Sequence, residues 1–125
     1  MNYRTALTEL YTPGTAITAR ATTALTRGQF VAVVAGDDTS HPNVAVCPAG
    51  DRPFGLAHLD ADTDTLVGIQ RGNGRCFRVP ATGSITAGAH VEVGADGTAT
   101  THTTGEVAGT ALHAATDGHV DITLA

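Results

Sequence analysis

The sequence lacks lysine and tryptophan and has few aromatic residues of any kind. Its 125 residues include two Tyr and three Phe, so aromatics make up only 4% of the chain. Large side chains contribute most to burial, and a hydrophobic fraction made mainly of Ala and Val therefore predicts a thin core. With such a core, oligomerisation or docking on a larger surface would add stability.

Positive charge is also scarce. Twelve acidic residues oppose seven basic ones, all of them Arg, and the net charge is -5. Binding a phosphate backbone needs a concentrated positive surface, whereas the densest basic group here is Arg71, Arg75 and Arg78. We therefore expect that nucleic acid is not a partner.

Long apolar runs are missing too. No run approaches the ~20 residues that a membrane helix needs. The N-terminal residues also lack the apolar segment of a secretory signal. We expect no membrane partner, and assembly in a cytoplasm.

Cysteine is limited to Cys47 and Cys76, which are too few for a disulfide scaffold and form no CxxC pair. We predict two reduced thiols that pack as small apolar groups, with an inter-sheet disulfide as the alternative.

The residues that are abundant, Gly, Thr, Ala and Val, form short apolar runs broken about every ten residues by Gly, Pro or Asp-Gly. This spacing is typical of a β-barrel or sandwich, and no convincing helical period appears after Thr15. Turns are indicated at Asp96-Gly97, Asp117-Gly118 and Asn73-Gly74, the last as a hairpin. The predicted strands are Ala16–Arg20, Gln29–Ala35, Asn43–Cys47, Phe54–Leu59, Leu66–Gln70, Arg75–Val79, His90–Val93, Thr98–Thr101, Glu106–Leu112 and His119–Leu124.

An internal repeat organises these strands. Leu25–Val33 aligns with Ile85–Val93, and Phe54–Ala57 aligns with Ala108–Ala111. Each copy opens with a Gly turn and closes with a strand, and this pattern predicts two similar β-units. The alternative is a chance similarity between segments that are rich in Gly, Thr and Val. The expected fold is all-β, a compact barrel or sandwich of two similar units. Residues 1–24 are predicted to form an extended N-terminal arm, with at most a short helix within Arg4–Leu10, and residues 25–125 the β-barrel domain.

The sequence offers no constellation for a metal site. Its six histidines form no HxH, HxxxH or HExxH, and we expect them on the surface or rim. The stretch Asp60–Asp64 resembles the start of a calcium loop, but Thr65 and Arg71 stand where an EF-hand needs Gly and Glu. A solvated acidic loop is the interpretation, with weak adventitious cation binding as the alternative.

Nucleophilic catalysis is not indicated either. The only serines, Ser40 and Ser84, lie outside any GxSxG motif. Cys76 lies near two arginines but follows no helix N-terminus, so nothing marks a reactive thiolate. We predict that the protein is not an enzyme and has no catalytic, cofactor-binding or metal-binding residues and no cofactor.

Several fragments, taken in order, resemble the phage capsid decoration (cement) family. They are Tyr11-x-Pro13-Gly14-x-x-Ile17-Thr18-Ala19, Leu25-Thr26-x-Gly28, Phe77-x-Val79-Pro80-Ala81, Gly83-x-Ile85-Thr86-x-Gly88-x-x-Val91-x-Val93, Asp96-Gly97, Gly109-x-Ala111 and Gly118–Leu124. The chain departs from that pattern by extra residues before Tyr11 and by a longer, Asp-rich stretch at Asp37–Pro42.

The resemblance implies a compact β-barrel with an extended arm on the outside of an icosahedral head. It implies that the major capsid protein is the partner, and that the chain forms a homo-oligomer, with a trimer favoured, at or near three-fold positions. The location it implies is the capsid surface of a virion assembled in a host cytoplasm. Such a protein braces neighbouring capsid subunits.

We expect the arm to supply much of the capsid contact, because its large apolar residues fall outside the barrel pattern and an extended segment can add to a neighbour's sheet edge. These candidate contact residues are Tyr3, Leu7, Leu10, Tyr11 and Ile17. A frayed terminus that touches nothing is the alternative.

Two other functions stay open. One is another virion structural role, such as a tail-tube or spike domain, which would share the composition and β-content. The other is a small ligand-binding β-barrel. A biotinyl or lipoyl carrier is excluded because it needs a Lys, and a carbohydrate-binding module would need more aromatic residues than the chain has.

Overall fold

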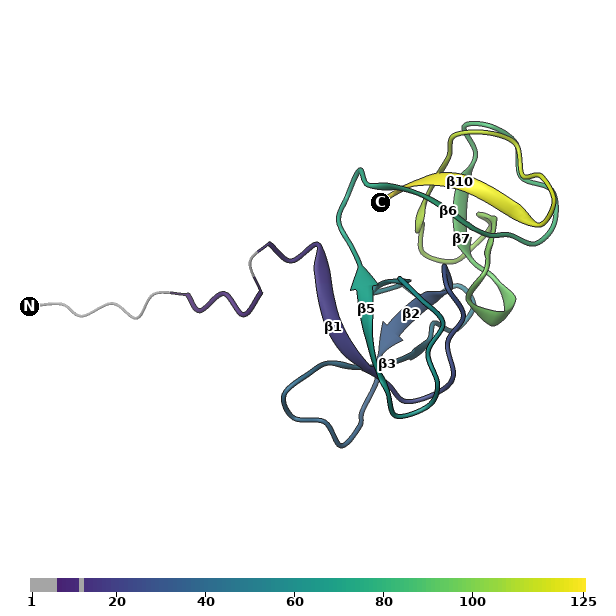
Figure 1. Cartoon of the computed structure of the whole chain (residues 1–125). Coiled ribbons are helices and arrows are strands. Elements are labelled where there is room, and N and C mark those ends of the chain that lie inside the picture. Colours follow the sequence, from purple (N-terminus) through teal and green to yellow (C-terminus); the bar gives the residue numbers. More distant parts are fainter. Residues whose placement is uncertain (1–6, 12) are drawn as a thin grey trace, which may run out of the picture.

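A computed structural model describes residues 7–11 and 13–125 of the chain (Figure 1). All ten predicted strands are present, and three of them have the predicted bounds. The elements are β1 (Ala16–Ala21), β2 (Phe30–Val33), β3 (Asn43–Val46), β4 (Gly55–Ala57), β5 (Leu66–Gln70), β6 (Cys76–Pro80), β7 (His90–Val93), the 3-10 turn η1 (Ala95–Gly97), β8 (Ala99–Thr101), β9 (Gly109–Ala111) and β10 (His119–Leu124).

The short helix predicted within Arg4–Leu10 is not seen in the part of that segment that the structure describes. Residues 7–10 are not helical, and residues 4–6 lie outside the described residues. Across 7–11 and 13–125, no helix is long and apolar enough to cross a membrane.

The first unit, β1 to β5, is a closed barrel with the strand order β1-β3-β2-β4-β5. The pair β1–β3 is parallel, and β5 returns to pair with β1 in antiparallel register. Alternate residues of these strands point inward, since side chains alternate between the two faces of a strand. Small and β-branched residues therefore fill the barrel, among them Ala19, Ala21, Val31, Val44 and Ile69.

The second unit, β6 to β10, repeats the first. Its strand order is β6-β10-β9-β7-β8, and a parallel bridge between Ala81 and Ala99 brings its two edges together. The same parallel pairing joins Ala21 to Val44 in the first unit. Each strand of one unit thus has an equivalent in the other, and the predicted internal repeat is confirmed.

The glycine of the repeated Leu/Ile-Thr-x-Gly motif makes the same turn in each unit, just before β2 or β7. Gly28 and Gly88 have φ angles of 84° and 81°, a region that favours Gly. Each donates its N–H over 2.8 Å to the carbonyl of an equivalent alanine, Ala57 or Ala111. The turn therefore requires Gly at this position of the motif, because its backbone has a positive φ angle in both units.

The predicted hairpin at Asn73-Gly74 is wrong, although a turn does lie there. A hairpin joins adjacent paired strands, whereas β5 pairs with β1 and β4, and β6 pairs with β10. The turn instead connects the two units. The Asp96-Gly97 turn does join paired strands, β7 and β8, and both of its residues have positive φ.

The barrel begins earlier in the chain than residue 25. The division into an arm of residues 1–24 and a domain of residues 25–125 leaves β1 in the arm, whereas β1 pairs with two strands of the first unit. Ile17, Ala19 and Ala21 are buried and alternate with more exposed neighbours. Two of these three inward positions are Ala, which makes the amphipathic pattern weak in the sequence. The segment before the barrel therefore ends near residue 15.

The two units share a core at their junction. Phe30, Cys47 and Leu56 of the first unit are buried in one cluster with the interior residues of the second unit. The backbones approach closely there, since a Cβ added to Gly28 would lie 2.8 Å from Cδ of Pro80. The part of the first barrel's surface that carries Phe30, Cys47 and Leu56 is thus covered by the second unit.

Two backbone hydrogen bonds add to this junction. The N–H of Gly50 donates to the carbonyl of Val93 over 2.8 Å, and the N–H of Glu106 donates to the carbonyl of Gly50 over 2.9 Å. A loop of each unit therefore contacts the other unit.

Candidate functional site

The segment before β1 exposes large apolar side chains. Leu7 is 98% exposed, Leu10 80% and Tyr11 36%. Figure 1 shows this segment leaving β1 and running away from both units. We call the described residues of this segment, 7–11 and 13–15, the arm. Its exposed leucines are costly in water unless a partner covers them.

Not every predicted contact residue lies on the arm. Ile17 belongs to β1 and is 4% exposed, with its side chain on the same inward face as Ala19 and Ala21. It stabilises the barrel and offers no surface to a partner. Tyr3 lies outside the described residues. Of the five candidates, Leu7, Leu10 and Tyr11 lie on the arm and are exposed.

Two arginines fix the base of the arm. The N–H of Arg71 and Nη1 of Arg75 both donate to the carbonyl of Thr15, over 2.9 and 2.7 Å. Nη1 of Arg71 lies 3.4 Å from the carbonyl of Gly14. Hydrogen bonds from charged donors are about twice as strong as neutral ones. The arm therefore starts from a rigid point even though its apolar residues are exposed.

The same arginines are themselves held in place. The Arg71 guanidinium lies over the Phe54 ring, 4.2 Å from its centroid, and Arg75 lies 4.8 Å from the centroid of Phe77. Nε of Arg71 also donates to the carbonyl of Phe54 over 2.7 Å. The sequence shows these arginines only as a small basic group, and it does not show that they lie beside the arm.

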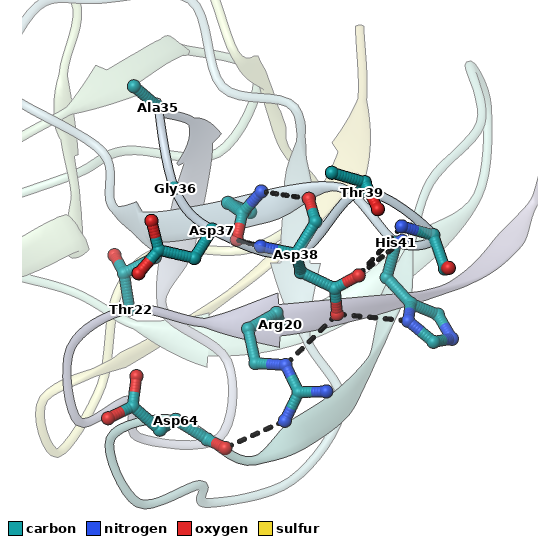
Figure 2. Close-up of a pocket in the computed structure, with 11 residues that line it drawn as sticks. Arg20, Thr22, Ala35, Gly36, Asp37, Asp38, Thr39, His41 and Asp64 are labelled. Carbon is teal, nitrogen blue, oxygen red and sulfur yellow. Dashed lines mark hydrogen bonds and ion pairs between the residues drawn. The ribbon is translucent and has the colours of Figure 1, made fainter.

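A second feature is the loop between β2 and β3, which contains the Asp-rich stretch Asp37–Pro42. Asp38 organises it, since its carboxylate accepts hydrogen bonds from the N–H groups of Ser40 and His41 and from Nε of Arg20 (Figure 2). Asn43 supports the turn by donating to the carbonyl of Asp38 over 2.9 Å. The longer loop is therefore ordered by its own acidic residue.

The hydrogen bonds to Asp38 lower its pKa. The N–H of Ser40 has the largest effect, followed by the N–H of His41, and these with the Arg20 guanidinium hold the pKa of the carboxyl well below its usual range. Asp38 thus stays ionised at neutral pH and holds the loop together.

A third feature is a groove between the two units. Its walls come from the turn at Thr26–Gly28 and from His58–Asp60 of the first unit, and from Phe77–Pro80 and His119 of the second. Leu59 is exposed at its rim. The N–H of Arg27 donates to the Asp60 carboxylate over 2.8 Å, which ties two of its walls together.

The remaining candidates for chemistry are the His, Cys, Asp and Glu side chains. Among residues 7–11 and 13–125, no three His, Cys, Asp or Glu side chains are grouped so as to hold a metal ion. Both cysteines are free; Cys76 is exposed and Cys47 is buried. Burial, together with the nearby Asp51 carboxylate, raises the pKa of the Cys47 thiol to about 11, so it is not a thiolate at neutral pH.

Comparisons with known proteins give a family match and a similar solved structure. A family model described as phage cement protein matches residues 11–125. Among solved structures, the chain is similar to the N base of the head fiber gp8.5 of bacteriophage phi29. The TM-score is 0.74 at 25% sequence identity, and the match covers 88% of this chain and 92% of the other. No curated protein sequence matches the chain.

The class of protein is therefore a capsid-associated structural protein, with an all-β fold of two repeated units. The chain belongs to the phage cement protein family.

Proposed function

We propose that this protein binds the outer surface of an icosahedral phage head and stabilises contacts between major capsid subunits. In this proposal it acts as a homotrimer at or near three-fold positions, after assembly in the host cytoplasm. Binding that spans a seam and favours the mature lattice stabilises that lattice by mass action, without chemistry.

The observation that carries this proposal is the arm. It presents Leu7, Leu10 and Tyr11 to solvent from a base fixed by Arg71 and Arg75. Covering one such large side chain contributes roughly 1.5–3 kcal/mol. A fixed base reduces the conformational entropy lost on binding, and several arms on one oligomer multiply the affinity through avidity.

The family and its structural relative favour a head protein over the alternatives. The relative is a head fiber protein, and the family is a cement family. No comparable observation supports a tail-tube or spike domain, or a small ligand-binding barrel.

The test is binding to purified heads that lack this protein. A triple variant, Leu7→Ser with Leu10→Ser and Tyr11→Ser, should lose head occupancy in a co-sedimentation assay while its circular dichroism spectrum stays that of the wild type. The control is Leu59→Ser with Leu66→Ser, which changes exposed leucines outside the arm and should bind normally.

Two results would contradict the proposal at different levels. If the triple variant occupies heads as well as the wild type, the arm is not the contact. If the wild type itself has no affinity for heads, the capsid-binding function is wrong.

A further inference from the structure

We propose that the edge of β6 binds an extended, acidic segment of the capsid partner, which adds to the sheet of the second unit as a further strand. The inference rests on the proposed function, because it takes the capsid as the source of this segment. It gives the folded part of the chain a contact of its own, in addition to the contact made by the arm.

The strand β6 pairs on one side only, with β10. The C=O of Arg75 and the N–H of Ala81 both make hydrogen bonds of 2.8 Å on the β10 side. In an antiparallel pair the residues that bond to the partner strand alternate with residues that do not. The N–H and C=O groups of Cys76 and Arg78 therefore point away from β10. In the part of the chain that the structure describes, no backbone group is bonded to them.

The first unit closes the equivalent edge. The N–H groups of Arg20 and Thr22 donate to β3 and to the residue before it, over 2.7 and 2.8 Å. In the second unit Thr82 makes the equivalent of the Thr22 bond, to β8 over 2.9 Å. The repeat places Pro80 at the position of Arg20, and Pro has no N–H to donate. The second unit therefore stays open along β6.

The open edge is accessible. Residues 77–80 are consecutive and all line the groove between the two units, so the groove runs along β6. The side chains of Cys76 and Arg78 are exposed. An edge with free backbone donors and acceptors is a template for a further strand, and Pro80 limits the pairing to a short segment. Leu59, at the rim of the other wall, is not part of this contact.

The same edge begins at the base of the arm (Figure 1). Arg75 directly precedes β6, and its Nη1 donates to the carbonyl of Thr15 over 2.7 Å. Its guanidinium also lies 4.8 Å from the centroid of the Phe77 ring, in the middle of the strand. The arm and the edge of β6 are therefore neighbouring parts of one surface, and a partner that covers the arm can contact both.

The charges around the edge favour carboxylates on the partner. Two arginines, Arg27 and Arg78, line the groove against one acidic residue, Asp60. Arg78 is paired with Asp121. Among residues 7–11 and 13–125, no carboxylate forms an ion pair with the guanidinium of Arg27 or Arg75. The chain as a whole has a net charge of -5, so this local excess of arginine selects an acidic segment.

These features together define the chemistry of the partner. Free N–H and C=O groups on a strand edge are matched by a second backbone in extended form, and in such complexes the main-chain hydrogen bonds supply the affinity. The arm of a second copy is the other possible occupant. Its described part has one acidic residue, Glu9, and the proposed function already assigns its leucines to the capsid.

The experiment compares two variants of Cys76 in the co-sedimentation assay with heads that lack this protein. Cys76→Pro removes the outward N–H and leaves the bonds between β6 and β10, because Pro is tolerated where the N–H of an edge strand faces outward. Cys76→Ala keeps the N–H and changes only the side chain. Loss of one hydrogen bond should weaken head binding about tenfold in Cys76→Pro, whereas Cys76→Ala should bind as the wild type does.

Hydrogen exchange of the wild-type chain tests the edge without a substitution. The amides of Cys76 and Arg78 should exchange rapidly in the free protein and at least about tenfold more slowly on saturating heads, since exchange then requires the added strand to open. The amides of Phe77 and Val79 are the internal control, because they bond to β10 and should be slow in both states.

A charge change tests the acidic character of the segment. Arg27→Glu should weaken head binding, and the loss should shrink as the salt concentration rises. Arg52→Glu is the matched control, because Arg52 is exposed and does not line the groove. Equal losses in the two variants would show a general effect of net charge and would contradict an acidic segment at this edge.

Two further outcomes would overturn the inference. If heads leave the exchange of the Cys76 and Arg78 amides unchanged, the edge is only a protected edge. If these amides become slow in concentrated protein without heads, the occupant is a second copy. In both cases the wild type can still bind heads through the arm, so a failure of the edge contact is distinguishable from a failure of the proposed function.

Discussion

The junction between the units can be tested through Phe30 and its equivalent, His90. Phe30→Ala removes a ring that is 0% exposed and that joins the core of the second unit. His90→Ala makes the matched change at the same position of the repeat, where the side chain is exposed. The two variants therefore separate the effect of the junction from the effect of the strand position.

The expected magnitudes differ widely. Truncation of a buried Phe to Ala lowers the free energy of unfolding by about 3–5 kcal/mol, because the cost of the remaining cavity adds to the loss of buried apolar surface. Exposed substitutions usually stay within about 0.5 kcal/mol. Single domains have a total unfolding free energy of roughly 5–15 kcal/mol, so Phe30→Ala should remove a large part of it.

The assay is urea unfolding followed by far-UV circular dichroism, since the chain has no Trp for fluorescence. The midpoint should fall strongly for Phe30→Ala and remain nearly unchanged for His90→Ala. Equal, small losses of stability in the two variants would show that the units do not depend on a shared core, and the description of the junction would be refuted.

Two further predictions concern stability. Gly55→Ala should destabilise the protein by about 1–3 kcal/mol, because a Cβ there would lie 2.6 Å from the carbonyl oxygen of Gln70. The control Gly68→Ala should be tolerated, because its Cβ would meet only the side chain of His58, at 3.7 Å. Equal thermal midpoints of the two variants would contradict this prediction. Hydrogen bonds, first of all from the N–H of Thr103, lower the pKa of the Glu92 carboxyl below its usual 4.5. The ionised carboxylate therefore adds to the free energy of unfolding in full above pH 4.5, and this stabilisation is lost as the pH falls through the folded-state pKa. Urea unfolding between pH 6 and pH 3 should show a smaller loss of stability for Glu92→Gln than for the wild type, and parallel curves would count against the role of Glu92.

Much of the fold could be predicted from the sequence, because the signals for strands and turns are local. Asp96-Gly97 and the Gly28 and Gly88 motifs specify backbone conformations that few other residues adopt, and the strands between them were identified by their apolar runs. Alignment of the two copies also predicted the repeated unit. The strand at Ala16–Arg20 is predicted as well, but it is assigned to the arm, because the sequence does not show that it pairs with β3 and β5.

The candidate site could be predicted only in part. Leu7, Leu10 and Tyr11 lie in the arm as expected, whereas Ile17 is buried, because the sequence does not show where the arm ends and the barrel begins. The support from Arg71 and Arg75 could not be predicted, since these residues lie more than fifty positions away from the carbonyl groups that they bind.

By itself, the sequence determined the strands, the turns and the existence of two similar units, because these follow from the local spacing of apolar residues and glycines. Only the tertiary structure decided which copy of each repeated position is covered. Phe30 and His90 occupy the same place in their units, yet one is buried and the other is exposed. The physical reason is that burial depends on which surface of one unit packs against the other, and that choice is made by contacts between residues far apart in the chain.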